Sequence, residues 1–364
     1  MHTLFPCAAA LALLGALGAP AHSATVQTEQ RALAAFSAIE LSGPYQVLIV
    51  AQGARALELS GPAGQLAEVE TVVNDGTLFV RPHKARNFLS QFGNNDEPVT
   101  VRIRAAGLQG LRAGGSGDVT LEQFQGRQLK LDLSGAGALR VAGSARELTF
   151  QGSGSGDADL RRLQTASATL RLQGAGKVRA GAVSEQLHAE IDGAGDLDAG
   201  QVRARSVTVL LRGAGGMTLA GSAATLMVEL DGGGDFDGKD LKVLRASGRN
   251  RGPGNLTLGL VSEALEATLQ GSGKLTATLA GKSVRLLMQG PGDAALSGST
   301  DSIDAELSGP GNLDARRLLA GHAELRVRGP GQAFVNVRRK PGAEPGGAAS
   351  RVVRVDRAGA RQVQ

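Results

Sequence analysis

Pairs of glycines separated by one residue recur every 19 to 20 residues over more than half of the chain. A fixed step of this length indicates a repeat architecture in which each unit stacks on the one before it. A helical repeat would lose about 1 kcal/mol at each interior glycine, whereas a tight corner between strands favours a residue that has no Cβ and reaches positive φ. The pairs begin at Gly115, Gly135, Gly154, Gly174, Gly193, Gly213, Gly232, Gly252, Gly271, Gly290, Gly309 and Gly329.

Apolar and polar residues alternate before most of these pairs, as in Leu129, Leu131 and Leu133. This period of two is typical of strands that turn one side inward. Residues 111–337 are therefore predicted to form an all-β, single-stranded parallel β-helix of about twelve coils, right-handed because parallel crossovers favour that hand. Its structural corners include Gly115, Gly117, Gly135, Gly137, Gly174, Gly176, Gly193, Gly195, Gly213 and Gly215.

Residues 25–110 lack the repeat and are predicted to form an N-terminal β cap with the first coils, which protects strand edges from exposure. Asn74-Asp75-Gly76 between two strand-like segments indicates a β-hairpin, and the polar segment 84–97 indicates a loop. With no Trp and one Tyr in the chain, the core of the coils is expected to be thin and aliphatic. The strand-like segments are Phe36 to Leu41, Tyr45 to Val50, Leu57 to Ser60, Glu68 to Val73, Thr77 to Arg81 and Val99 to Arg104.

The two ends of the chain differ in composition from the repeat. An apolar run from Ala8 to Ala19, followed by small residues, is the pattern of a secretory signal peptide, which is assigned to residues 1–24. Its removal leaves no cysteine, which excludes disulfides and thiolate metal sites. No later segment approaches the roughly 20 apolar residues of a membrane-spanning helix. Residues 338–364 hold seven basic and two acidic residues and are predicted to be a flexible basic tail.

Motifs in a fixed order connect the cap to the repeat. They are Phe36 to Gly43, Tyr45 to Val50, Asn74 to Val80, Val99 to Ile103 and Leu111 to Val119. Together they resemble the bacterial head GIN domain family, whose members are described as auto-transporter adhesins. The resemblance covers the mature chain to about residue 337 and implies a right-handed β-helix in the envelope or outside the cell, with no known chemistry. The number of coils indicates an extended or tandem copy.

The residue before each glycine pair is polar in nearly every coil. Equivalent residues of successive coils stack, so these positions are predicted to form a polar ladder of alternating charge made of Asp192, Arg212, Asp231 and Arg251. Opposite charges directly across neighbouring strands are favourable and like charges are not. We interpret the ladder mainly as a device that fixes the register of the coils, with a binding role as the alternative.

Carboxylates two residues apart recur as Asp157/Asp159, Asp196/Asp198 and Asp235/Asp237. Paired acids about 5 to 9.5 Å apart hydrolyse glycosidic bonds, so a polysaccharide hydrolase or lyase is an alternative function. An active site is normally one asymmetric cluster, however, and repetition on coil after coil favours a structural interpretation. The histidines lack metal-ligand spacing and the glycine pairs lack a βαβ context, so neither a metal nor a cofactor is predicted.

The sequence thus favours a non-enzymatic exported protein, located in the periplasm, at the outer membrane or outside the cell. Its repetitive faces are expected to bind an anionic envelope polymer or another surface protein. Nucleic acid is not an expected partner, because basic patches interleaved with aromatic residues are absent. A purely structural spacer is the remaining alternative.

Overall fold

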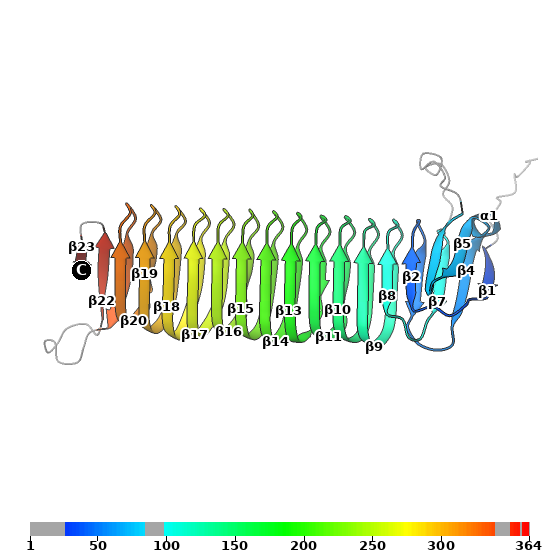
Figure 1. Cartoon of the computed structure of the whole chain (residues 1–364), viewed down its shortest axis with the longest axis horizontal. Helices are drawn as coiled ribbons and strands as arrows, with labels where there is room; N and C mark the ends of the chain where they lie inside the picture. The colour runs from blue at the N-terminus through cyan, green and yellow to red at the C-terminus, as the bar shows by residue number, and fades with distance from the viewer. Residues whose placement is uncertain (1–25, 84–97, 339–349, 357–358, 364) are drawn as a thin grey trace, which may run out of the picture.

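The protein is a long β-solenoid with a small β domain at its N-terminal end (Figure 1). A computed structural model describes residues 26–83, 98–338, 350–356 and 359–363. Twelve glycine corners bound about eleven stacked turns, and the single helix of the described part is the four-residue α1 (Ala63–Leu66). The predicted all-β parallel solenoid is confirmed, while the sense of its winding stays a prediction. The predicted signal peptide and the 84–97 loop lie outside the described residues.

Most coils consist of one strand of 14 or 15 residues. Each strand pairs in parallel with the strands of the coils before and after it. The strands are β9 (Val119–Leu133), β10 (Leu139–Gly152), β11 (Ala158–Leu172), β12 (Val178–Ala180), β13 (Val183–Ile191), β14 (Leu197–Leu211), β15 (Met217–Leu230), β16 (Phe236–Asn250), β17 (Leu256–Leu269), β18 (Leu275–Met288), β19 (Ala294–Leu307) and β20 (Leu313–Val327).

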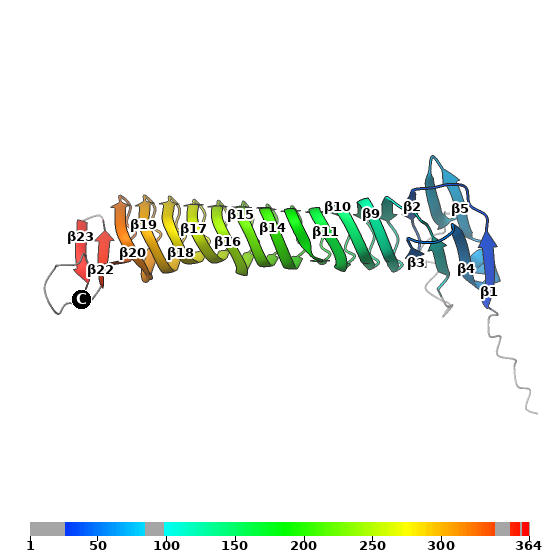
Figure 2. The same ribbon diagram turned by 90° about the horizontal axis from the view of Figure 1, so that it is seen from below.

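Every coil also has a second corner, which the glycine pairs did not predict. The register shifts near the middle of most strands, and three glycines there have positive φ: Gly143 (139°), Gly221 (123°) and Gly298 (100°). At this bend the chain crosses from one side of the flattened rod to the other, and the glycine pair brings it back (Figures 1 and 2). Apart from the coil made of β12 and β13, each of these coils is therefore one bent strand.

The glycine pairs lie at the predicted corners, but the reason for glycine differs from the one inferred above. None of the paired glycines is among the residues with φ in the left-handed region. Instead, a Cβ added at Gly135 or Gly137 would overlap the carbonyl oxygen of Gly115 or Gly117 on the preceding coil. Glycine is needed because neighbouring coils stack backbone on backbone at this corner.

The core runs the length of the rod and is mainly aliphatic, with Leu129, Leu131 and Leu133 no more than 3% exposed. The prediction missed three buried phenylalanines, each followed two residues later by a glycine. A Cβ on that glycine would lie 2.7 to 3.0 Å from the phenylalanine ring, so the ring occupies space that a second side chain would fill. The pairs are Phe124 with Gly126, Phe150 with Gly152, and Phe236 with Gly238.

The N-terminal β cap contains the predicted strands within about two residues at each end. The predicted hairpin joins β5 to β6, with Asp75 (φ 47°) and Gly76 (φ 72°) in the left-handed conformation that such turns require. The strands are β1 (Val26–Arg31), β2 (Ala38–Leu41), β3 (Gln46–Val50), β4 (Ala56–Pro62), β5 (Val69–Asn74), β6 (Thr77–Pro82), β7 (Thr100–Arg104) and β8 (Gly110–Ala113). Strands β6, β2 and β8 are parallel and lead directly into β9.

Three short strands continue beyond β20, and the last two of them lie within residues 338–364, for which a flexible tail was predicted. They are β21 (Ala333–Arg338), β22 (Ser350–Asp356) and β23 (Gly359–Val363). Strand β21 pairs with β20 only as far as Ala320, and β22 and β23 follow antiparallel. In the described part, the last residues of β20 pair with β19 alone. Leu325 and Val327 there are only partly buried, whereas Leu307 one coil earlier is fully buried.

Candidate binding face

The four residues of the predicted polar ladder are joined in the structure as two ion pairs. Arg212 Nη1 lies 2.9 Å from Asp192 Oδ1, and Arg251 Nε lies 2.6 Å from Asp231 Oδ1. Each arginine also pairs with a glutamate on the coil of its aspartate, Arg212 with Glu190 and Arg251 with Glu229. The hydrogen bond from Arg212 is the main cause of the lowered pKa of Glu190. Each arginine thus bridges two carboxylates of the preceding coil.

Replacing Arg212 by Asp is expected to lower the melting temperature more than replacing it by Gln. Gln removes an exposed ion pair that solvent screens and that therefore contributes little, whereas Asp adds a third carboxylate beside Glu190 and Asp192. Thermal unfolding followed by circular dichroism measures the difference. Arg203 is exposed and has no ion-pair partner among the described residues, so Arg203→Gln is the matched control. Equal losses for the two Arg212 variants would contradict a role in register.

A second ladder lies just after the glycine pairs, where side chains of one coil accept hydrogen bonds from the backbone of the next coil. Asp157 Oδ1 accepts the backbone N–H of Lys177 at 2.9 Å, and Asp196 Oδ1 accepts that of Gly216 at 2.9 Å. Asn255 accepts the N–H of Lys274 in the same way. Each of these hydrogen bonds joins one coil to the next. The acceptors are Asp118, Asp157, Asp196, Asp235, Asn255, Asp293 and Asn312.

Replacing Asp196 by Asn should leave stability nearly unchanged, because an amide oxygen accepts the Gly216 N–H as Asn255 and Asn312 do on their own coils. Replacing Asp196 by Ala removes the acceptor and should cost about 1 kcal/mol. Denaturant unfolding of the two variants measures this difference. If Asn were as damaging as Ala, the carboxylate charge rather than the hydrogen bond would matter.

Five of the six paired carboxylates considered above as catalytic candidates accept hydrogen bonds from other groups. Asp157 accepts the backbone bond described above, and Asp159 accepts two hydrogen bonds from Arg161, at 2.6 and 2.9 Å, that lower its pKa to about 2. In the described residues, every carboxyl group with a shifted pKa is shifted downward. A glycosidase general acid needs the opposite shift. The described part also holds no cluster of three or more His, Cys, Asp or Glu that could bind a metal ion.

One side of the rod forms an uninterrupted outward surface, here named the broad face. It consists of the second halves of the coils, continued into the cap by β8, β2 and β6. Register partners run along its middle from one strand to the next without a gap. This central row is Thr77, Ala38, Gly110, Lys130, Thr149, Thr169, His188, Thr208, Met227, Ser247, Glu266, Arg285, Asp304 and Glu324.

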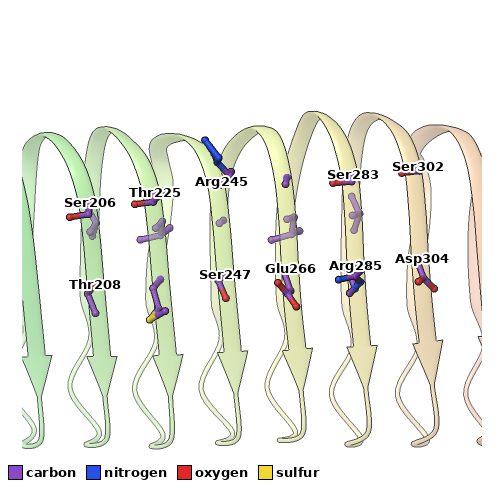
Figure 3. A pocket seen from close by; sticks show the side chains of 17 residues that line it. Ser206, Thr208, Thr225, Arg245, Ser247, Glu266, Ser283, Arg285, Ser302 and Asp304 are labelled. Carbon is purple, nitrogen blue, oxygen red and sulfur yellow. The ribbon is translucent and has the colours of Figure 1, made fainter.

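The broad face is hollowed in two places. The distal hollow, about 570 Å³, spans β14 to β19 and is lined by two rows of side chains, one with Ser206, Thr225 and Arg245 and the other with Ser247 and Glu266 among its members (Figure 3). The cap hollow, about 530 Å³, lies over β6, β2, β8, β9 and β10. Sequence reasoning missed this face, because its residues share no motif and become neighbours only through the register.

A β cap, stacked glycine corners and one continuous polar face define the class of capped parallel β-solenoids. Three overlapping stretches, residues 35–199, 184–275 and 257–350, match the family model described as "Putative auto-transporter adhesin, head GIN domain". The chain belongs to the head GIN domain family, of which it is an extended member.

Solved structures also match the chain, at low sequence identity. A "putative adhesin" from Bacteroides fragilis is 16% identical, with a TM-score of 0.34 and coverage of 78% of this chain and 98% of its own. A "putative lipid binding protein" from Parabacteroides distasonis is 17% identical, with a TM-score of 0.39 and coverage of 75% and 97%. A "putative adhesin" from the same species is 13% identical, with a TM-score of 0.38 and coverage of 84% and 98%. No curated protein matches the chain.

Proposed function

We propose that this protein is an exported, non-enzymatic adhesin-like protein that binds an extended surface polymer or protein along its broad face. The observation that carries the proposal is the central row, which passes from the cap to the last full coil without a break in register. A ligand that is itself long and repetitive could make equivalent contacts on successive coils. The description of the matching family as an adhesin supports the same assignment.

The chemistry of the carboxylates supports a binding protein over a polysaccharide-cleaving enzyme. Asp157 accepts a backbone N–H, and Asp159 accepts hydrogen bonds from Arg161 that lower its pKa to about 2. A proton donor to a glycosidic oxygen has to be neutral at working pH. These carboxylates are better suited to holding coils together than to acid catalysis.

Export is supported by the N-terminal sequence pattern and by the name of the family. Among the residues that the structure describes, no helix has the length and apolar character needed to span a bilayer. Location in the periplasm, at the outer membrane or outside the cell is part of the proposal.

Retention on isolated envelope polymers and on whole bacterial cells tests the proposal. The full chain should be retained, and Met227→Glu together with Arg285→Glu on the broad face should abolish retention. Thr276→Glu is the matched control, because Thr276 is exposed on the opposite side of the rod. Equal retention of both variants would contradict binding through the broad face. Release of cleaved sugar would favour the alternative of a polysaccharide hydrolase or lyase. Failure of the full chain to be retained would favour the alternative of a purely structural spacer.

A further inference from the structure

The two hollows of the broad face lie in the same central row, which determines their separation. The cap hollow is centred near Gly110 and the distal hollow near Ser247 and Glu266. Seven to eight register steps separate them along the row. With strands about 4.8 Å apart, the two hollows are about 35 to 40 Å from one another. Their nearest lining residues in the row, Thr149 and Thr208, are three register steps or about 14 Å apart. A ligand that occupies both hollows is therefore an extended one.

The strip between the hollows, made of the same two rows that line the distal hollow, is uncharged and rich in hydrogen-bonding groups. Its two rows carry hydroxyl, amide and imidazole side chains on β11, β13 and β14, namely Ser167, Thr169, Gln186, His188, Ser206 and Thr208. Charged residues begin only at the two ends, with Lys130 and Glu147 near the cap and Arg245 and Glu266 at the distal hollow. This strip offers donors and acceptors to a ligand but no net charge to a polyanion.

Charged groups beside the row are largely neutralised within the protein. Arg112 pairs with Glu40 at 2.9 Å at the cap hollow, and Arg171 pairs with Glu190 at 3.3 Å beside the strip. At the distal hollow Arg245 pairs with Glu263 at 3.3 Å. Both signs are present along the face, so electrostatic attraction favours neither an acidic nor a basic polymer.

Each hollow has a large apolar side chain in an outward row among polar neighbours. Met227 lines the distal hollow and is 52% exposed, an unusual position for such a side chain in a polar row. Phe79 lines the cap hollow beside Arg112 and Lys130. An apolar surface flanked by hydrogen-bonding groups suits a sugar ring, which presents C–H groups on its faces and hydroxyl groups at its rim.

We propose that the broad face binds one unbranched, uncharged polysaccharide that occupies both hollows at once. The inference rests on the proposed function and specifies its ligand. A polymer that reaches both hollows engages the second hollow as an intramolecular event, which raises its affinity by about 100-fold over that of either hollow alone. Oligosaccharides that fit within a single hollow bind that hollow only.

The test measures binding of the full chain to an array of immobilised neutral and acidic polysaccharides, followed by a size-fractionated series of the best neutral binder. Affinity should rise by about 100-fold once the oligosaccharides reach the length that bridges the hollows. Ser247→Gln fills the distal hollow and Gly110→Gln fills the cap hollow. A Cβ at Gly110 would lie 3.5 Å from that of Ala38, so this substitution fits the fold.

Either variant should reduce polymer affinity to that of short oligosaccharides and remove the dependence on length. Thr276→Gln, on the opposite side of the rod, should change neither and controls for the added amide. Preference for acidic polysaccharides, or for a protein, would overturn the inference and leave the proposed function intact. Binding of a neutral polymer without length dependence would overturn the two-hollow arrangement. Absence of binding to every polymer and protein would contradict the proposed function itself.

Discussion

Replacing Gly232 by Ala is expected to destabilise the solenoid by about 3 kcal/mol, the upper end of what overpacking usually costs. A Cβ at this position would overlap the carbonyl oxygen of Gly213 and lie 2.5 Å from that of Arg212. Both atoms belong to the backbone of the preceding coil, which hydrogen bonds on both sides hold in place. The coils would have to separate locally, so the variant should also lose hydrogen-exchange protection around this corner.

Gly233→Ala is the control for that prediction. Gly233 is the middle residue of the same corner, and the nearest atom to an added Cβ is Pro253 Cγ at 4.0 Å. The change should alter stability by no more than about 0.5 kcal/mol. Chemical denaturation of both variants gives the comparison. Similar losses at the two positions would mean that glycine is required for backbone flexibility at the corner and not for close stacking.

Phe150→Leu and Gly152→Leu are each expected to destabilise the core, and the double variant is expected to recover much of the loss. Phe150 is fully buried, and its ring would lie 3.0 Å from a Cβ added at Gly152. The first change leaves space unfilled beside the glycine, and the second forces a side chain into the ring; each should cost about 1–3 kcal/mol. The neighbouring coils carry Leu131 and Leu133, or Leu170 and Leu172, at the register-equivalent positions.

The double variant reproduces that leucine pair. Its loss of stability should therefore be smaller than the sum of the two single losses by at least about 1 kcal/mol in a double-mutant cycle. Denaturant unfolding of the four proteins provides the cycle. Phe150→Ala, which removes the ring without a replacement, should lose about 3–5 kcal/mol and sets the scale. Additive losses in the cycle would show that Phe150 and Gly152 do not share one volume in the core.

Local sequence signals predicted the parts of the fold that depend on spacing within one coil. The spacing of the glycine pairs predicted the positions of all twelve corners. The alternation of apolar and polar residues predicted core residues such as Leu129, Leu131 and Leu133. Asn74-Asp75-Gly76 predicted the cap hairpin because both of its turn residues need positive φ. In each case the physical cause lies within a few residues of the signal.

Features that depend on contacts between coils could not be predicted from local sequence signals. The bend within each strand has no fixed residue, since Gly143, Gly221 and Gly298 occupy it in only some coils. In the sequence Asp196 stood out only as one of a recurring pair of carboxylates, whereas in the structure its carboxylate accepts a hydrogen bond from the N–H of Gly216, twenty residues away. The broad face emerged only when the register placed Met227 between Thr208 and Ser247. Long-range pairing, and not residue type, determines these features.

The two ends of the solenoid are closed to different degrees. At the N-terminal end, each half of β9 pairs with a strand of the cap, one half with β3 and the other with β8. At the other end, the last residues of β20 pair only with β19 in the described part. In a stack where each unit contacts only its neighbours, such an end has the least cooperative support. Leu325 and Val327 should therefore be the first core residues to become exposed. Unfolding should begin at this end and proceed coil by coil toward the cap.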